Sequence, residues 1–232
     1  MERRNAVMTP DEKRTIAFHE AGHAIAGWFL EHADPLLKVT IIPRSGGALG
    51  FAQYLPKEVQ LFTREALVDR MCMALGGRVA EELTFGRVTT GASDDLDKVT
   101  KLAYAITTVY GMNARVGQIS FPRGDEQQFD KPYSEATARV IDEEVKALVD
   151  ECYKRTKDLL ATHADKIKRV AELLLERETI SQIDIARLAG DRPWPVTAGL
   201  REYLSAASAM TGAKEEGKNA EPAAPAGEPV AA

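Results

Sequence analysis

The sequence predicts a mainly α-helical domain that carries one small β-hairpin. Three observations lead to this fold class. Apolar residues recur at helical spacing along most of the chain, capping signals mark where several of these stretches begin, and a single pair of short β-like runs flanks a glycine turn. The chain has 232 residues, of which 44% are hydrophobic and 28% are charged. These proportions are those of an ordinary globular fold.

The first predicted helix begins after Thr9 and runs to about Glu31. Thr9 is a favourable N-cap, Pro10 suits the first helical position, and Glu12 completes a capping box. Apart from His19, Glu20 and His23, nearly all residues of Thr15–Leu30 are apolar. Such a helix has no polar face to turn to water, so we expect it to be buried.

The remaining predicted elements follow in chain order. A turn at residues 44–47 joins two strands into the hairpin, and helices make up the rest of the domain. The strands are expected at 37–43 and 49–55, and the helices at 63–83, 93–111, 133–160, 165–177 and 181–189. Gly76 and Gly77 interrupt the second helix of the chain and lower its helix propensity. We expect this pair to permit a close approach of another helix, at Gly22 or Gly27.

Four segments are expected along the chain. Residues 1–8 are expected to be a linker remnant, 9–190 the folded domain, 191–211 a C-terminal extension, and 212–232 a disordered tail rich in Ala, Pro, Glu and Gly. No apolar run reaches the roughly 18 residues of a membrane span, and the first residues do not form a secretory signal. We therefore expect this chain to be soluble by itself.

Composition excludes several classes of function. A net charge of −5 and the absence of a Lys/Arg run argue against a nucleic-acid partner. Cys72 and Cys152 are the two cysteines of the chain, and neither belongs to a Cys-x-x-Cys pair. A disulfide scaffold and a thiolate zinc site are therefore both unexpected.

The segment His19-Glu20-Ala21-Gly22-His23 places three ionisable groups inside the apolar first helix. Their burial is costly unless a partner compensates it, and a divalent metal is such a partner. Positions four apart lie on one face of a helix, so His19 and His23 can both direct a ring nitrogen at one zinc ion. Glu20 is offset by about 100° and can reach a water on that metal rather than the metal itself. The spacing therefore predicts a zinc hydrolase site, with Glu20 as the catalytic residue.

Helix spacing supplies two ligands, and a catalytic zinc needs a third. Ala26 and Phe29 stand where a His-x-x-Gly-x-x-His extension would need Gly and His, which excludes that class. His32, at a helix end, and His163, in a polar turn, are expected at the surface. Acidic candidates remain, and spacing alone does not choose among them: Glu81, Glu82, Asp94, Asp95 and Asp97. Asp94 and Asp95 have the local advantage of a helix N-terminus, where carboxylates are favoured.

Several stretches together resemble one known family, the FtsH-type ATP-dependent zinc metalloproteases. The stretches that carry the resemblance, in order, are His19–His23, Gly76–Glu82 and Thr90–Leu96. The similarity spans about Pro10 to Leu188 and is closer still to the mitochondrial m-AAA, or paraplegin-like, branch. The segments that resemble this branch are Leu36–Pro43, Asp69–Met73, Gly117–Phe121 and Lys131–Arg139.

The resemblance implies a site and an activity. It implies a helical zinc metallopeptidase domain at 9–190, with Zn2+ held by His19, His23 and Asp95. Glu20 would be the general base, and Glu81 and Glu82 would be supporting residues. A small sheet near the active site would receive unfolded or misfolded polypeptide along its edge strand, at Gly50, Phe51, Ala52, Gln53 and Tyr54. The alternative for this strand is an ordinary edge covered by another subunit.

The resemblance also implies a setting for the chain. Family members are membrane-anchored AAA+ quality-control proteases that assemble as homo- or hetero-hexamers, and those of this branch face the matrix from the mitochondrial inner membrane. The chain has no Gly-x-x-x-x-Gly-Lys-[Ser/Thr] phosphate loop. We therefore expect it to be the protease module, with ATPase and membrane anchor on segments absent from it. Two alternatives stay open: a catalytically silent, metal-bound assembly subunit, and a structural zinc site with four protein ligands.

Overall fold

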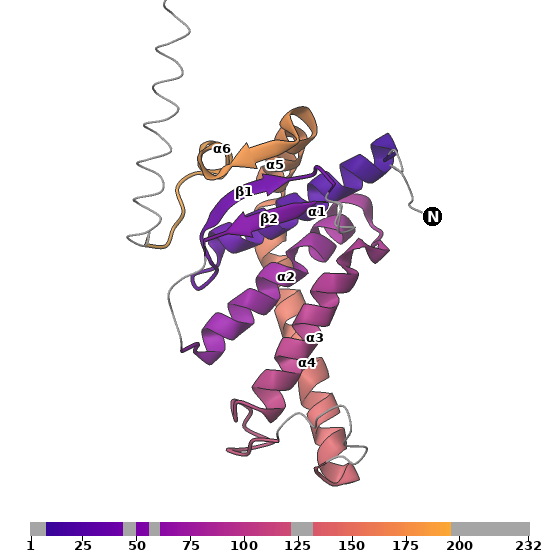
Figure 1. Cartoon of the computed structure of the whole chain (residues 1–232), viewed down its shortest axis with the longest axis vertical. Coiled ribbons are helices and arrows are strands. Elements are labelled where there is room, and N and C mark those ends of the chain that lie inside the picture. The colour runs from indigo at the N-terminus through magenta and orange to yellow at the C-terminus, as the bar shows by residue number, and fades with distance from the viewer. Residues whose placement is uncertain (1–7, 44–49, 56–60, 122–131, 196–232) are drawn as a thin grey trace, which may run out of the picture. The chain divides into compact units, whose positions relative to one another are not determined.

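Helices make up most of the described chain, and one small antiparallel sheet completes it, as the sequence predicted (Figure 1). The computed structural model describes residues 8–43, 50–55, 61–121 and 132–195. The helices are α1 (Pro10–Phe29), α2 (Arg64–Phe85), α3 (Ser93–Thr108), α4 (Glu135–Thr162), α5 (Ala164–Arg177) and α6 (Gln182–Ala189), with a 3-10 turn at Thr90–Ala92. The strands are β1 (Leu36–Thr40), β2 (Phe51–Tyr54) and β3 (Thr179–Ser181). Residues 1–7 of the expected linker, the hairpin turn, and the parts of the extension and tail beyond 195 lie outside the described residues.

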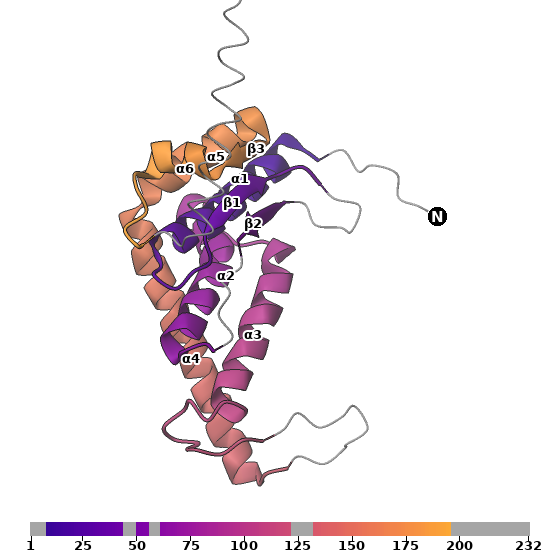
Figure 2. The same ribbon diagram turned by 60° about the vertical axis from the view of Figure 1, so that its left-hand side comes forward.

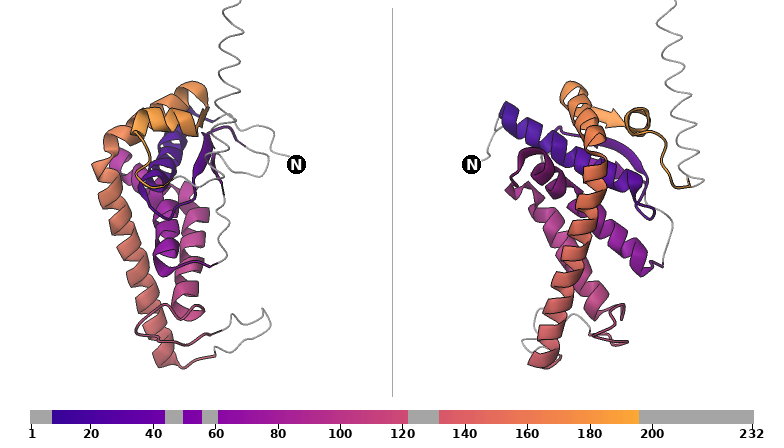
Figure 3. Two further views of the ribbon diagram at one scale, coloured as in Figure 1. Left: turned by 90° about the vertical axis from the view of Figure 1, so that its left-hand side faces the viewer. Right: turned by 180° about the vertical axis from the view of Figure 1, so that it is seen from behind.

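The first helix is buried because other elements cover it on opposite sides. The sheet lies on one side of α1 and α5 lies on the other (Figures 1 and 3). Every residue from Ala17 to Trp28 is buried as a result. The expected capping box is present, with Thr9 and Glu12 exchanging hydrogen bonds. Although α1 is largely apolar, no helix of the described ranges combines the length and hydropathy needed to cross a membrane.

The sheet has three strands in the order β2-β1-β3, and both pairings are antiparallel. The hairpin of β1 and β2 was predicted, whereas β3 was missed. Three residues are too few to show the alternation that marks a strand. β3 exists through its long-range pairing with β1, in which Val39 lies opposite Ile180. Because β1 is central, β2 is an edge strand.

Helices α2, α3 and α4 extend away from the sheet alongside one another (Figure 2). Helix α1 crosses α2 at Gly22 and Gly76, near the middle of each helix. The crossing is close because two glycines meet there, as expected. A Cβ atom on Gly22 would lie 2.3 Å from the Gly76 carbonyl oxygen, and one on Gly76 would lie 2.7 Å from the Gly22 carbonyl oxygen. Gly27 faces the side chain of Met73 instead. The backbone of α2 therefore lies directly against the turn of α1 that carries the two histidines.

The chain after α6 closes the C-terminal end of α1, where helix carbonyls lack intrahelical partners. The Arg192 guanidinium donates hydrogen bonds to the carbonyl oxygens of Leu30 and Ala33, and the Trp194 indole donates one to that of Phe29. Residues 191–195 therefore pack on the domain.

Candidate metal centre

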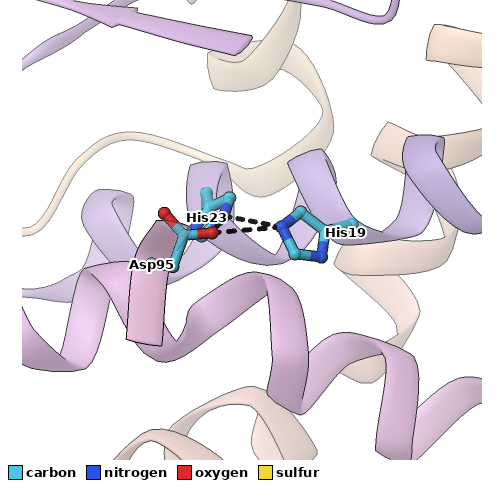
Figure 4. Close-up of side chains that lie close together, drawn as sticks. All are labelled: His19, His23 and Asp95. Carbon is cyan, nitrogen blue, oxygen red and sulfur yellow. Dashed lines mark hydrogen bonds and ion pairs between the residues drawn. The ribbon is translucent and has the colours of Figure 1, made fainter. Parts of the chain in front are cut away.

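Three side chains from two helices converge on one point (Figure 4). His19 and His23 project from adjacent turns of α1, and their Nε2 atoms lie 3.0 Å apart. Asp95 comes from the first turn of α3. Its Oδ2 lies 3.3 Å from His19 Nε2 and 3.2 Å from His23 Nε2. The structure thus brings together residues 19, 23 and 95, the three that the family resemblance implied as ligands.

Hydrogen bonds at the Nδ1 atoms fix the orientation and the tautomer of both imidazoles. His19 Nδ1 donates to Glu81 Oε1 at 2.7 Å, and His23 Nδ1 donates to the Met73 carbonyl oxygen at 2.9 Å. In neutral imidazoles whose Nδ1 carries the proton, each Nε2 has a lone pair. Two such lone pairs and a carboxylate oxygen therefore face one another. This arrangement is stable only with a cation or a proton between them.

The residues present fit zinc. A tetrahedral ion with bonds of about 2.0–2.1 Å has ligand atoms about 3.3 Å apart, and the separations here are 3.0, 3.2 and 3.3 Å. Two imidazoles and one carboxylate are a common donor set for catalytic zinc. Within the described residues no fourth His, Cys, Asp or Glu joins the group. The fourth tetrahedral position is therefore free of protein ligands from this part of the chain, unlike that of a structural site.

Surrounding charges also favour a cation at this point. Burial lowers the pKa of His19, but hydrogen bonds with Asp95 and Glu81 more than offset it and raise that pKa to about 9. Burial opposes ionisation of Asp95 as well, yet its hydrogen bonds with the two imidazoles hold its pKa well below the usual range. The carboxylates near this point outnumber the cationic side chains that pair with them, so the site attracts positive charge.

Glu20 lies beside the three-ligand group without belonging to it. It is 7% exposed, and within the described residues nothing donates a hydrogen bond to its carboxylate. Burial raises its pKa, while the charges of His23 and His19 partly counter this shift. A Cβ atom on Gly50 would lie 2.7 Å from Glu20 Oε1. The absence of a side chain at position 50 thus leaves room for the Glu20 carboxylate.

The group opens into a cavity of about 960 Å³. Residues of α1, α2 and α3 line it together with the start and body of β2. Four of the five expected substrate-binding residues belong to its wall: Gly50, Phe51, Ala52 and Tyr54. Gln53 is exposed and does not line it. The cavity therefore joins the Glu20 carboxylate, the three-ligand group and an edge strand in one space.

The structure gives different partners to Glu81 and Glu82, between which the sequence spacing did not choose. Glu81 is buried and accepts hydrogen bonds from His19 and from the backbone N–H of Thr89. Glu82 points elsewhere and pairs with Tyr153 and Lys157. The remaining candidates, His32, His163, Asp94 and Asp97, do not join the group.

Sequence reasoning missed two contributors to the site. One is the Met73 carbonyl, which orients His23 and leaves no signal in side-chain patterns. The other is Gly77, where a Cβ atom would lie 2.4 Å from His19 Nε2. The sequence indicated that Gly76 and Gly77 would permit close helix packing. Gly76 does so, whereas Gly77 leaves room for the imidazole of His19.

Comparison with known proteins gives consistent matches. Residues 6–188 match the model of peptidase family M41. The chain is 54% identical over 212 residues, 90% of its length, to "Mitochondrial inner membrane m-AAA protease component AFG3L2" of Mus musculus, covering 26% of that protein. It is 53% identical over 194 residues, 84% of its length, to "ATP-dependent zinc metalloprotease FTSH 10, mitochondrial" of Arabidopsis thaliana, covering 24% of that protein.

A bacterial relative matches at a similar level. The chain is 50% identical over 198 residues, 84% of its length, to "ATP-dependent zinc metalloprotease FtsH" of Rhodothermus marinus, covering 28% of that protein. The chain thus spans about a quarter of the length of the curated relatives it matches. Because the family model covers well over half of its residues, with the His19–His23 segment inside the match, the chain belongs to peptidase family M41.

Proposed function

We propose that this chain is the zinc-dependent endopeptidase module of a membrane-anchored AAA+ quality-control protease. The observation that carries the proposal is the position of the Glu20 carboxylate beside the His19, His23 and Asp95 group in one cavity. These three side chains would hold the zinc ion. When bound there, zinc lowers the pKa of a coordinated water and polarises the scissile carbonyl.

Glu20 is the general base of the proposed reaction. It accepts the proton of the attacking water and then delivers it to the leaving amine. Burial raises the pKa of Glu20 and so makes its carboxylate a stronger base than a solvated glutamate. His19 and His23 take no part in this proton transfer. Their Nδ1 protons are donated to Glu81 and to the Met73 carbonyl, and their Nε2 atoms are the proposed zinc ligands.

The proposed substrate is an unfolded polypeptide bound along β2. This strand is an edge of the sheet and its residues wall the cavity. An extended peptide that adds to such an edge is held by main-chain hydrogen bonds, which tolerate many sequences. We therefore expect weak sequence selectivity, so that the choice of substrate depends on unfolding.

The setting is proposed from the relatives, whose names describe an ATP-dependent zinc metalloprotease and components of a mitochondrial inner membrane m-AAA protease. We place this module in a ring of like subunits, a homo- or hetero-hexamer, on the matrix side of that membrane. The ATPase and the membrane anchor would lie on segments outside this chain.

The test is the variant Glu20→Gln in the full 232-residue chain. Its zinc content and its hydrolysis of unfolded casein are measured with and without a chelator. We expect one zinc per chain and a loss of turnover of at least about 100-fold, which is the contribution typical of a general base. Asp94→Asn is the matched control, because Asp94 also lines the cavity but joins no ligand group.

Two results would contradict the proposal. Turnover that is unchanged in Glu20→Gln would remove Glu20 as the base. A wild-type chain that binds zinc yet cleaves nothing would favour the alternative of a silent, metal-bound assembly subunit.

A further inference from the structure

The two oxygens of the Asp95 carboxylate have different partners. Oδ2 faces the imidazoles of His19 and His23. Oδ1 faces away from them and accepts a hydrogen bond from the ammonium of Lys98, with Nζ at 3.1 Å. Lys98 lies three residues further along α3, so its side chain returns over the same helix face.

We propose that Lys98 is a positioning residue that keeps Asp95 monodentate toward the metal and so keeps the fourth coordination position open for water. This inference rests on the proposed zinc peptidase function. A carboxylate can offer one or both of its oxygens to zinc. Were Oδ1 also to coordinate, it would take up the space that the attacking water needs. An oxygen that accepts a hydrogen bond from an ammonium is a weaker ligand, and the hydrogen bond holds it turned toward Lys98 rather than toward the metal.

An ordinary surface ion pair is the simpler alternative, and α3 contains one for comparison. Lys101 pairs with Asp97 at 2.6 Å, and both of these side chains are mostly exposed, at 65% and 58%. Lys98 is just as exposed, at 68%, but its partner Asp95 is only 16% exposed. Lys98 also lines the cavity, whereas Lys101 and Asp97 do not. The Lys98 pair thus differs from an ordinary surface pair by ending on a proposed ligand.

The charge of Lys98 reaches the other groups of the site. It contributes to lowering the pKa of Asp95 and of Glu20. An ammonium here also repels a zinc ion, since both are positive. Removal of Lys98 should therefore leave zinc affinity unchanged or increase it, while turnover falls. A residue that merely kept the site folded would have the opposite effect on affinity.

The experiment compares Lys98→Met, Lys98→Arg and Lys101→Met with wild type, all as the full 232-residue chain. X-ray absorption of the zinc-loaded chain and the visible spectrum of the cobalt-loaded chain report the number of ligands. Competition with a chromophoric chelator gives the metal affinity, and casein hydrolysis gives kcat and KM.

In Lys98→Met we expect an added oxygen ligand, affinity for zinc at least as high as in wild type, and kcat lower by about tenfold, the smaller end of the effect of outer-shell partners. Lys98→Arg keeps a cationic donor and should restore the wild-type coordination and most of kcat. Lys101→Met should match wild type throughout.

Two outcomes would overturn the inference about Lys98. One is a coordination number in Lys98→Met equal to that of wild type. The other is a zinc affinity that falls together with kcat, which indicates that Lys98 only holds Asp95 in place. A wild-type chain that binds no zinc would instead refute the proposed function itself, so the two failures are distinguishable.

Discussion

The contact between Gly77 and the imidazole of His19 gives a sharp prediction for Gly77→Ala. A Cβ atom at position 77 would lie 2.4 Å from Nε2, 2.5 Å from Cε1 and 2.6 Å from Cδ2 of that ring. Non-bonded carbon atoms prefer separations of about 3.5 Å or more. The added methyl group therefore overlaps the ring by about 1 Å.

The imidazole cannot move aside without losing its partners. Its Nδ1 is held by Glu81 at 2.7 Å, and its Nε2 faces His23 and Asp95. A displacement of about 1 Å in a catalytic group costs roughly 100-fold in rate. We expect kcat to fall by about that factor and zinc affinity to fall by about 10- to 100-fold.

The free energy of unfolding should change much less than kcat and zinc affinity. Overpacking costs about 1–3 kcal/mol, whereas alanine in place of glycine within a helix returns about 1 kcal/mol. The metal-free Gly77→Ala chain should therefore lose about 0–2 kcal/mol in its free energy of unfolding.

Urea unfolding of the metal-free chain and chelator competition for zinc test these two effects separately. Gly76→Ala is the matched comparison, because its Cβ would meet the Gly22 carbonyl oxygen at 2.7 Å, in a backbone that cannot rotate away. Because the same helix gain of about 1 kcal/mol applies, it should lose about 2 kcal/mol, the upper end of overpacking costs less that gain. Zinc affinity and turnover that stay at wild-type values in Gly77→Ala would refute the argument that position 77 must be empty for His19.

Other variants test the third ligand and the coupling of metal to folding. Asp95→Asn should weaken zinc binding by at least about 100-fold, because a neutral amide is a poor zinc ligand, whereas Glu82→Gln, whose carboxylate pairs with Tyr153 and Lys157, should leave it unchanged. Chelator competition measures both, and a reversed result would move the third ligand to α2. Free zinc at 100 times its Kd should raise the free energy of unfolding by about 2.7 kcal/mol, and a chelator should abolish this gain. Urea curves that coincide with and without zinc would mean that the native chain holds no such site.

Local signals in the sequence predicted the helices well. The capping box predicted at Thr9 and Glu12 is present, and the helix predicted at 181–189 begins after Ser181, which caps it, because capping depends on residues within one turn of each other. β3 was missed for the converse reason. Its hydrogen bonds go to β1, about 140 residues away along the chain, and nothing within its own three residues indicates that partner.

By itself, the sequence determined that two imidazoles and one carboxylate would lie on a buried helix, because positions 19, 20 and 23 are related by helix geometry alone. Only the tertiary structure determined which groups contact these side chains. Asp95 is 76 residues from His19, Glu81 is 62 residues from it, and the Met73 carbonyl is 50 residues from His23. These partners arrive through the packing of α2 and α3 against α1. Gly22 and Gly76 set how closely α2 can approach, and Gly77 leaves room for the His19 imidazole. Spacing along a chain does not determine such contacts, since they depend on which helix faces come together and at what distance.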